Sequence, residues 1–236
     1  DLIDVPMGLA TAPALAGKRV AILTHTGGAA GLVADVCGTA GFDTPPPGPA
    51  TVDRLRALLQ DDGFSPDRNP VDLTLAGLDP EVTYRAIVAL AESGDYDAVI
   101  PVVGSSSVGR PHLVADPVIR AMETVGKPVI VYTSPSAPGI VKRLNSAGIP
   151  TFDSPEACAA VLAALWHMPQ LADMPESEST VSKIGNTRNP FAGRKGSLNE
   201  AEAKQLFAIF GIPAVRETIV TSPTDASAAA QALGGR

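Results

Sequence analysis

The sequence has few of the features that mark disulfide scaffolds, membrane proteins or nucleic-acid-binding proteins. It has two cysteines in 236 residues, Cys37 and Cys158, each inside a helix-like apolar pattern and neither in a C-x-x-C motif. We therefore expect buried free thiols. No apolar run approaches the ~18 residues of a membrane span, and no signal peptide is visible. Basic clusters are also missing and the net charge is −7. This excludes nucleic acid or an anionic membrane as the main partner, and we expect a cytoplasmic protein.

One stretch, K-R-V-A-I-L-T-H-T-G-G-A-A-G at residues 18–31, organises the rest of the chain. Its β-branched apolar run has the length of a buried parallel strand and leads directly into Thr24, His25, Thr26, Gly27 and Gly28. A helix-like pattern follows. A helix N-terminus leaves backbone N–H groups without intrahelical partners beside the positive end of the helix dipole. The turn is therefore suited to bind a phosphate or carboxylate group.

Similar units of strand, loop and helix recur along the chain and predict a doubly wound parallel α/β sheet. Because the carboxyl ends of parallel strands meet at one edge, we expect the small-residue loop Gly104, Ser105 and Ser106 to lie beside the glycine turn. Besides the strand at 20–23, we expect strands at 42–44, 98–103, 129–132 and 150–152. Helices are expected at 29–40, at 80–92 with Asp79 as its cap, at 117–125, 139–147 and 154–166, and in a short segment capped by Thr51.

The segment 65–74, S-P-D-R-N-P-V-D-L-T, has too many helix and strand breakers for regular structure. Pro70 forces Asn69 toward an extended conformation, so that Asn69, Asp72 and Thr74 present polar groups at alternating positions. We expect an ordered loop, either a turn-forming segment alone or one that supports the site.

The last part of the chain is organised differently. Few core residues occur from 169 to 197, which we interpret as a surface linker. We then expect a helix capped by Asn199 at 200–210, a strand at about 217–221 and a helix that starts at Ser222. These elements cannot close a core of their own, so we expect this domain to continue beyond Arg236. The first residues, 1–16, have the pattern of a helix tail and a linker, and we expect a fragment of a longer protein.

Several of these segments together resemble the ADP-forming acyl-CoA synthetases, relatives of succinyl-CoA synthetase. The similar segments follow one another in order over nearly the whole chain, which makes their combination more specific than any one motif. They are G-K-R-V-A-I-L-T-H-T-G-G, D-R-N-P-V-D-L-T, D-A-V-I-P-V-V-G, G-K-P-V-I-V-Y, L-N-S-A-G-I-P-T-F-D-S-P-E and L-N-E-A-E-A-K-Q-L-F-A-I-F-G-I-P.

The resemblance implies that residues 17–168 are a flavodoxin-like, three-layer ligase domain and that residues 198–236 begin an ATP-grasp domain. It also implies ATP or ADP, Mg²⁺ and CoA as cofactors of the whole enzyme, with none bound wholly within this fragment. The partners implied are the CoA-binding, phosphohistidine-bearing and ATP-grasp domains of the same enzyme and a small carboxylic acid substrate. We expect a homo-oligomer, and a fragment that is inactive alone.

The chemistry implied by the resemblance is a relay in which an acyl phosphate forms, a histidine takes the phosphoryl group, and that histidine delivers it to ADP. In this family the helix after the glycine turn points its N-terminus at the phosphohistidine. Here the predicted donors are the backbone N–H groups of Thr26, Gly27, Gly28 and Ala29, with Thr24 in the same turn. Gly104, Ser105 and Ser106 match a glycine-rich loop of the family and are predicted to add further contacts.

His25 departs from the family pattern, in which Asn or another small polar residue is more common. The sequence His25-Thr26-Gly27-Gly28-Ala29 is similar to the S-H-T-G-A motif that holds the phosphorylated histidine of the preceding domain. An imidazole at a helix N-terminus is a neutral nucleophile near pH 7. We therefore keep three roles open for His25, namely phosphorylated nucleophile, phosphate contact and structural loop residue. His112 and His167 are expected at the surface.

Two other classes of function stay open. A nicotinamide- or flavin-binding domain of an oxidoreductase is expected to have G-x-G-x-x-G, and T-G-G-A-A-G at residues 26–31 lacks the first glycine. Asp43 falls near a ribose-binding position, although the three prolines beside it do not favour a second Rossmann strand. The second of these classes is a non-catalytic interaction domain that keeps the fold without the chemistry.

Overall fold

The computed structural model describes residues 2–58, 65–172, 191, 193 and 195–234. The chain forms two compact units, Asp1–Asp173 and Met174–Arg236, which we describe separately. Most of the expected linker at 169–197 lies outside the described residues.

The first unit contains one five-stranded sheet in which every strand pair is parallel. The strand order, β2-β1-β3-β4-β5, is that of flavodoxin-like folds. The predicted fold class is therefore confirmed. The strands are β1 (Val20–Thr24), β2 (Val71–Asp72), β3 (Ala98–Gly104), β4 (Val131–Ser134) and β5 (Thr151–Phe152).

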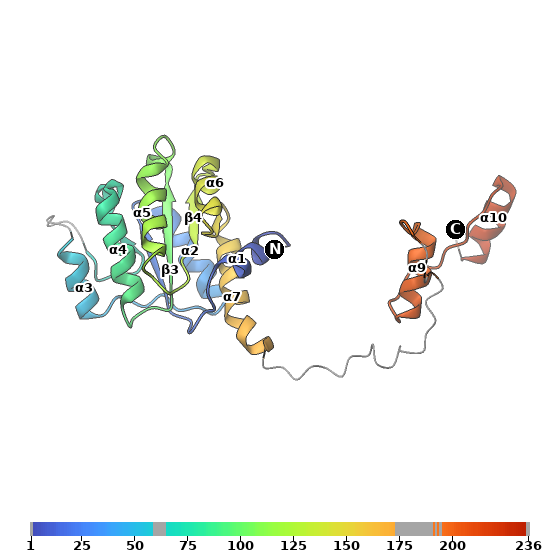
Figure 1. Cartoon of the computed structure of the whole chain (residues 1–236), viewed down its shortest axis with the longest axis horizontal. Helices are drawn as coiled ribbons and strands as arrows, with labels where there is room; N and C mark the ends of the chain where they lie inside the picture. The colour runs from blue at the N-terminus through green and yellow to red at the C-terminus, as the bar shows by residue number, and fades with distance from the viewer. Residues whose placement is uncertain (1, 59–64, 173–190, 192, 194, 235–236) are drawn as a thin grey trace. The chain divides into compact units, whose positions relative to one another are not determined.

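Helices cover both faces of this sheet (Figure 1). One face packs against α3 (Pro49–Arg56), α4 (Pro80–Glu92), α5 (His112–Met122) and α6 (Pro138–Ser146). The other face packs against α1 (Asp4–Thr11), α2 (Gly27–Thr39) and α7 (Pro155–Ala172). Two 3₁₀ helices, η1 (Thr74–Leu78) and η2 (Ser105–Ser107), follow β2 and β3. Within the described parts of the chain, no helix is both long and apolar enough to cross a membrane.

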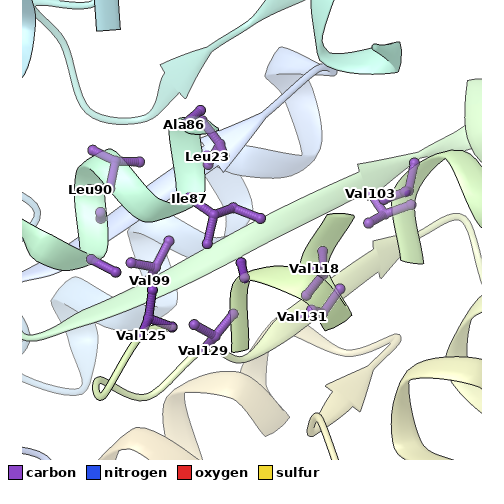
Figure 2. Close-up of a cluster of buried hydrophobic side chains, with 14 of the residues drawn as sticks. Leu23, Ala86, Ile87, Leu90, Val99, Val103, Val118, Val125, Val129 and Val131 are labelled. Carbon is purple, nitrogen blue, oxygen red and sulfur yellow. The ribbon is translucent and has the colours of Figure 1, made fainter. Parts of the chain in front are cut away.

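Alternate residues of the central strands enter the two cores, which is why these strands are apolar throughout. On β1, Ala21 and Leu23 pack into the core under α4 and α5, whereas Val20 and Ile22 pack into the core under α2 and α7. Figure 2 shows the first core, in which Val99 of β3 lies near Ile87 of α4.

The two cysteines are free and buried in the core between the sheet and helices α2 and α7, as predicted. Burial raises the pKa of the Cys37 thiol to about 12 and also raises the pKa of Cys158. Both side chains are therefore neutral thiols near pH 7, and they pack as small apolar groups.

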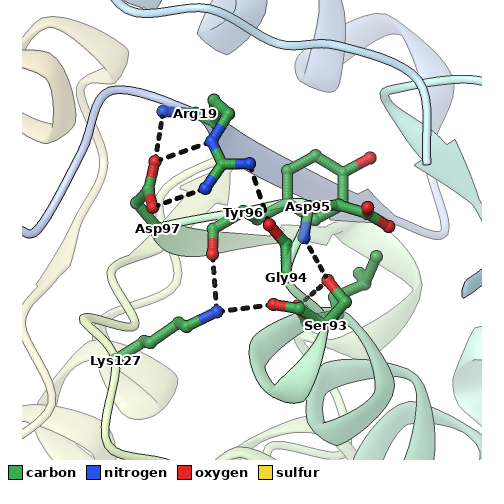
Figure 3. Close-up of polar contacts among 8 residues, drawn as sticks. Arg19, Ser93, Gly94, Asp95, Tyr96, Asp97 and Lys127 are labelled. Atoms are coloured by element: carbon green, nitrogen blue, oxygen red, sulfur yellow. Dashed lines mark hydrogen bonds and ion pairs between the residues drawn. The ribbon is translucent and has the colours of Figure 1, made fainter. Parts of the chain in front are cut away.

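A polar cluster joins the amino ends of β1 and β3 (Figure 3). The Arg19 guanidinium and backbone N–H donate to the Asp97 carboxylate at 2.9–3.1 Å. The Lys127 ammonium donates to the carbonyl oxygens of Ser93 and Tyr96, both at 2.6 Å. These bonds fix the turn between α4 and β3 on the side of the sheet opposite the glycine turn.

A proline explains why β4 differs from its predicted bounds. The strand was expected at 129–132 but spans Val131–Ser134, and Val129 forms only an isolated bridge to Val99. The Val99 N–H donates to the Pro128 carbonyl, so alternate N–H groups of β3 face β4. Pro101 falls at the next such position and has no N–H, which interrupts the ladder.

Four other predictions in this unit were wrong in detail. Residues 42–44 form no strand, and only Asp43 makes an isolated bridge to Arg19. Thr51 does not cap α3, because Gly48 holds that position and the Thr51 hydroxyl donates to Asp95 at 2.5 Å. Helix α5 begins at His112 rather than at residue 117, since its buried residues continue the helical pattern across Pro117. Helix α7 extends through Pro169 to Ala172.

The second unit contains α9 (Glu200–Ile209) and α10 (Pro223–Ala232). The predicted Asn199 cap is confirmed as a capping box with Glu202, and Ser222 caps α10 as expected. The strand predicted at 217–221 is wrong, because the described residues of this unit form no strand. A lone extended segment has no neighbour for its backbone hydrogen bonds, and Val215 and Ile219 are 73% and 74% exposed.

Candidate functional site

The glycine turn and the serine loop lie at the carboxyl edge of the sheet, as predicted. Thr24, the last residue of β1, is in register with Asp72 of β2 and Val102 of β3. Gly104 ends β3 and pairs with Ser134 of β4. Four strand ends therefore meet at this edge, in the position where open parallel sheets bind their ligands.

Helix α2 begins within the glycine turn. Its cap residue, Thr26, has an extended conformation and makes no side-chain capping bond. Gly27 and Gly28 are exposed, and Ala29 is half-buried. The two glycines have no side chain that could cover the N–H groups of this first turn. An added Cβ at Gly28 would meet nothing within 4 Å. The turn therefore offers backbone donors at the positive end of a 13-residue helix.

Two threonines hold the turn in place. The Thr24 hydroxyl donates to the Thr26 carbonyl and accepts from the Thr26 N–H, both at 2.8 Å. The Thr26 N–H was predicted to bind phosphate, but in the structure it is committed to Thr24, whose side chain is 2% exposed. We therefore reassign both threonines from ligand contact to support of the turn, which leaves Gly27, Gly28 and Ala29 as the backbone donors.

The serine loop contacts the glycine turn at Gly104. An added Cβ at this buried glycine would lie 2.5 Å from Thr26 Cγ2 and 3.4 Å from His25 Nε2, so no side chain fits there. Ser105 and Ser106 follow in η2 and are exposed. The structure thus brings the predicted serine hydroxyls to the same edge as the helix N-terminus.

His25 connects these two segments. Its Nε2 atom accepts a hydrogen bond from the Gly104 N–H at 3.2 Å. The imidazole is half-buried, and this burial lowers its pKa below the usual value, while the nearby Asp72 carboxylate raises it by a smaller amount. His25 is therefore neutral near pH 7.

The segment 65–74, predicted to have no regular structure, in fact contains β2 and the first residue of η1, and it supports β1 directly. The Asn69 side chain accepts from the Ile22 N–H at 2.9 Å and donates to the carbonyls of Val20 and Pro45 at 2.8 and 3.0 Å. Asp72 accepts from the Thr74 N–H at 2.8 Å. Thr74 has a φ of 52°, a strained conformation for a β-branched residue.

Sequence reasoning missed two features of this edge. Asp72 was expected only to support the loop, yet its Oδ2 lies 3.4 Å from the position that a Cβ on Gly27 would take, which places a negative charge beside the glycine turn. Gly77 of η1 packs against His25, and a Cβ there would lie 2.8 Å from His25 Cβ. Neither residue carries a local sequence signal, because both contacts depend on the order of strands in the sheet.

Asp43 is not part of this edge. Its backbone bonds to Lys18 and Val20, at the amino end of β1. The glycine turn lies beyond the other end of this five-residue strand, about 16 Å away at ~3.3 Å per residue. Asp43 is therefore not in the position of the acidic residue that would bind the ribose of a dinucleotide held at the glycine turn.

Two curated proteins are similar to this chain. Trans-feruloyl-CoA synthase FCS1 of an unknown prokaryotic organism is 26% identical over 246 residues, covering 99% of this chain and 33% of that protein. The α subunit of ADP-forming acetate–CoA ligase II of Pyrococcus furiosus is 33% identical over 177 residues, covering 70% of this chain and 37% of the subunit. The chain therefore spans about a third of the length of these relatives. No protein-family model matches it.

Solved structures show the same fold. A dinucleotide-forming acetyl-coenzyme A synthetase 1 of Ca. Korarchaeum cryptofilum, in complex with phosphate and ADP, superposes with a TM-score of 0.62 at 24% identity, over 71% of this chain and 36% of the synthetase. A Pyrococcus horikoshii OT3 protein gives 0.64 at 26% identity, over 73% and 41%. The curated relatives confirm the resemblance inferred from the sequence, and the solved structures share its fold.

Proposed function

We propose that this homologue of the ADP-forming acyl-CoA synthetases is the part of an acid–thiol ligase that holds a phosphoryl group at the N-terminus of α2. The whole enzyme would make acyl-CoA from a carboxylic acid, CoA and ATP through an acyl phosphate and a phosphohistidine. The observation that carries the proposal is the exposed pair Gly27 and Gly28, which opens a helix beside Gly104 at the carboxyl edge of the sheet.

The chemistry of this edge supports transient binding of a phosphoryl group. Backbone N–H groups at a helix N-terminus bind anions through charge-assisted hydrogen bonds of about 1.5–3 kcal/mol each. The exposed Ser105 and Ser106 supply hydroxyl donors from the second loop. Asp72 opposes a bound anion, so we expect weak binding of free phosphate, which suits a site that receives and releases a phosphoryl group.

The cofactors and partners of the proposed enzyme lie in other domains. ATP or ADP, Mg²⁺ and CoA would serve the whole ligase, and the phosphohistidine would come from a domain with the S-H-T-G-A motif. Residues 198–236, within the second unit, would contribute the start of an ATP-grasp domain. Its support is the similarity to FCS1, which extends over nearly the whole chain.

Phosphate titration of the ¹⁵N-labelled chain tests the site. We expect the backbone amide signals of Gly27 and Gly28 to move with an affinity of about millimolar, the range set by a few solvent-exposed hydrogen bonds. The amide signal of Gly211, in the second unit, is the internal control and is expected to stay in place. If phosphate moves neither glycine signal of the turn, the proposed site is wrong.

Titration of the labelled chain with NAD or FMN separates one alternative function. Binding of either cofactor at the carboxyl edge, in place of phosphate, would favour an oxidoreductase domain. For the full-length parent, incubation with labelled ATP, acid and CoA followed by mapping of acid-labile phosphate tests the relay. Label on a histidine of a preceding domain supports it, and the absence of histidine label contradicts it.

A further inference from the structure

His25 has a contact that the general phosphate-binding function does not require. The Gly104 N–H donates to Nε2 across 3.2 Å, although the two residues are 79 positions apart in the sequence. A ring nitrogen that accepts a hydrogen bond carries no proton, so the neutral imidazole has its proton on Nδ1. The bond therefore fixes both the tautomer and the position of the ring.

Glycines on two sides permit this close packing. At Gly104, an added Cβ would lie 3.4 Å from Nε2, and at Gly77 it would lie 2.8 Å from His25 Cβ. The His25 side chain is thus packed between the end of β3 and η1, which follows β2. His25 itself follows β1, so one side chain joins the carboxyl-end segments of three adjacent strands.

The burial of the ring favours its neutral form. Burial between the two glycine-containing segments disfavours the imidazolium and lowers the pKa, and Asp72 of β2 is the carboxylate whose charge acts in the opposite direction. Gly77 of η1 and Gly104 of β3 both approach His25, and neither carries a charge.

We propose that His25 is the positioning residue of the carboxyl-edge site, holding the serine loop against the glycine turn as a neutral hydrogen-bond acceptor and releasing it when Nε2 is protonated. This proposal rests on the proposed phosphate-binding function. It assigns His25 a role other than nucleophile, because a phosphoryl group on Nε2 would displace the Gly104 N–H. Protonation turns Nε2 into a donor, which cannot pair with another donor.

Two substitutions separate the acceptor from the rest of the side chain. In His25→Gln, Oε1 lies as many bonds from Cα as Nε2 does, so the variant keeps an acceptor and does not titrate. In His25→Asn, the amide is one carbon shorter and matches Nδ1 instead, so it loses the bond to Gly104. His167→Asn removes an exposed histidine of α7 and is the matched control.

Hydrogen exchange of the Gly104 amide is the first readout, corrected for the intrinsic pH dependence, on the whole chain. At about pH 7.5 we expect exchange about fivefold faster in His25→Asn than in the wild type, and near wild-type exchange in His25→Gln and His167→Asn. As the pH falls well below 6.5, the ordinary imidazole value, exchange should accelerate in the wild type but not in His25→Gln. A histidine whose Nε2 does not accept the Gly104 N–H would not produce this difference in pH profile.

Phosphate titration of the same variants is the second readout. At about pH 7.5 we expect His25→Asn to bind inorganic phosphate about fivefold more weakly than His25→Gln. Equal Gly104 exchange in the wild type and His25→Asn, or an imidazole ¹⁵N spectrum with the proton on Nε2, would overturn the positioning role. If Gly104 exchange responds as expected while phosphate does not move the amide signals of Gly27 and Gly28, the positioning role of His25 stands and the phosphate site is overturned.

Discussion

The Asn69 side chain makes hydrogen bonds to β1 that a neighbouring strand would otherwise make. Its Oδ1 accepts from the Ile22 N–H at 2.9 Å, and its Nδ2 donates to the Val20 carbonyl at 2.8 Å. Strand β2 pairs only with the last two residues of β1, Leu23 and Thr24. One amide side chain therefore extends the edge of the sheet and fixes the end of β1 from which the glycine turn projects.

Replacement of Asn69 by Asp tests this arrangement. The carboxylate keeps an acceptor for Ile22 but loses both donors, and it places a negative charge beside the carbonyls of Val20 and Pro45. We expect the free energy of unfolding of the first unit to fall by about 2–4 kcal/mol near pH 7. Trp166, the single tryptophan, reports this transition in urea denaturation.

Asn145→Asp is the matched control. Asn145 is half-buried like Asn69, but the bond that it makes is from the Thr151 N–H to Oδ1 at 3.0 Å, and Asp retains this acceptor. We expect a change within about 0.5 kcal/mol. Equal losses in the two variants would mean that the Asn69 amide donors contribute nothing specific.

The second prediction concerns the close approach of Gly104 to the glycine turn. In Gly104→Ala the new methyl group would lie 2.5 Å from Thr26 Cγ2 and 2.9 Å from Thr26 Cβ. Because both atoms belong to a short, branched side chain, we expect a loss of about 1–3 kcal/mol in the free energy of unfolding. Weaker phosphate binding should accompany this loss, measured from the amide shifts of Gly27 and Gly28.

Gly31→Ala adds the same methyl group to the exposed face of α2, where nothing lies within 4 Å. Alanine is favoured over glycine in a helix interior, so we expect a gain of about 0.5–1 kcal/mol and unchanged phosphate affinity. A Gly104→Ala variant that is as stable as the wild type would contradict the packing described here.

Local sequence signals predicted the elements whose causes are local. Asp79, Pro80 and Glu81 stand together at the start of α4, and the cap forms as expected, with Asp79 accepting from the Glu81 N–H at 2.8 Å. Strands β1 and β3 were recognised because a strand buried on both faces is apolar throughout. The parallel order of strand and helix units then sufficed for the fold class.

The missed elements depend on contacts between distant residues. Strand β2 has only two residues, so the segment carries no strand pattern of its own. The nearby Asn69 bonds to Ile22, 47 positions away, a contact that no local pattern predicts. The hydrogen bond between His25 and Gly104 depends on the strand order, which places β1 beside β3. At 217–221 the residues have strand propensity, but the described part of the second unit supplies no neighbouring strand.

The third prediction is a pH dependence of stability at the amino edge of the sheet. Burial raises the pKa of Asp97, but hydrogen bonds and charge from Arg19 outweigh this effect and lower it below the usual value. The side chains are 47% and 11% exposed for Arg19 and Asp97, so solvent screens part of the interaction. With a depressed folded-state pKa, the contribution is complete above about pH 4 and is lost as the pH falls through that pKa.

We expect Asp97→Asn to lower the free energy of unfolding by about 1–2 kcal/mol at pH 7 and to flatten its decline below about pH 4. The control is Glu92→Gln, which removes a pair with Arg54 whose side chains are 49% and 51% exposed, and its effect should stay within about 0.5 kcal/mol. Urea denaturation at several pH values measures both. An Asp97→Asn variant with wild-type acid dependence would show that other carboxylates cause it.

The fourth prediction follows from the carboxylate beside the glycine turn. Asp72 Oδ2 lies near Gly27, and its negative charge repels an anion bound there. Asp72→Asn keeps an acceptor for the Thr74 N–H and removes the charge, so we expect inorganic phosphate to bind about threefold to tenfold more tightly. The pKa of His25 should fall further, because the Asp72 charge raises it.

Asp35→Asn makes the same change of charge on an exposed residue of α2, more than two turns beyond Gly27. Charges at this distance from the turn are screened by solvent, so we expect phosphate affinity to change by less than about twofold. Amide shifts of Gly27 and Gly28 measure both affinities at one ionic strength. Weaker binding in Asp72→Asn than in Asp35→Asn would mean that the carboxylate organises the turn for its ligand rather than opposing it.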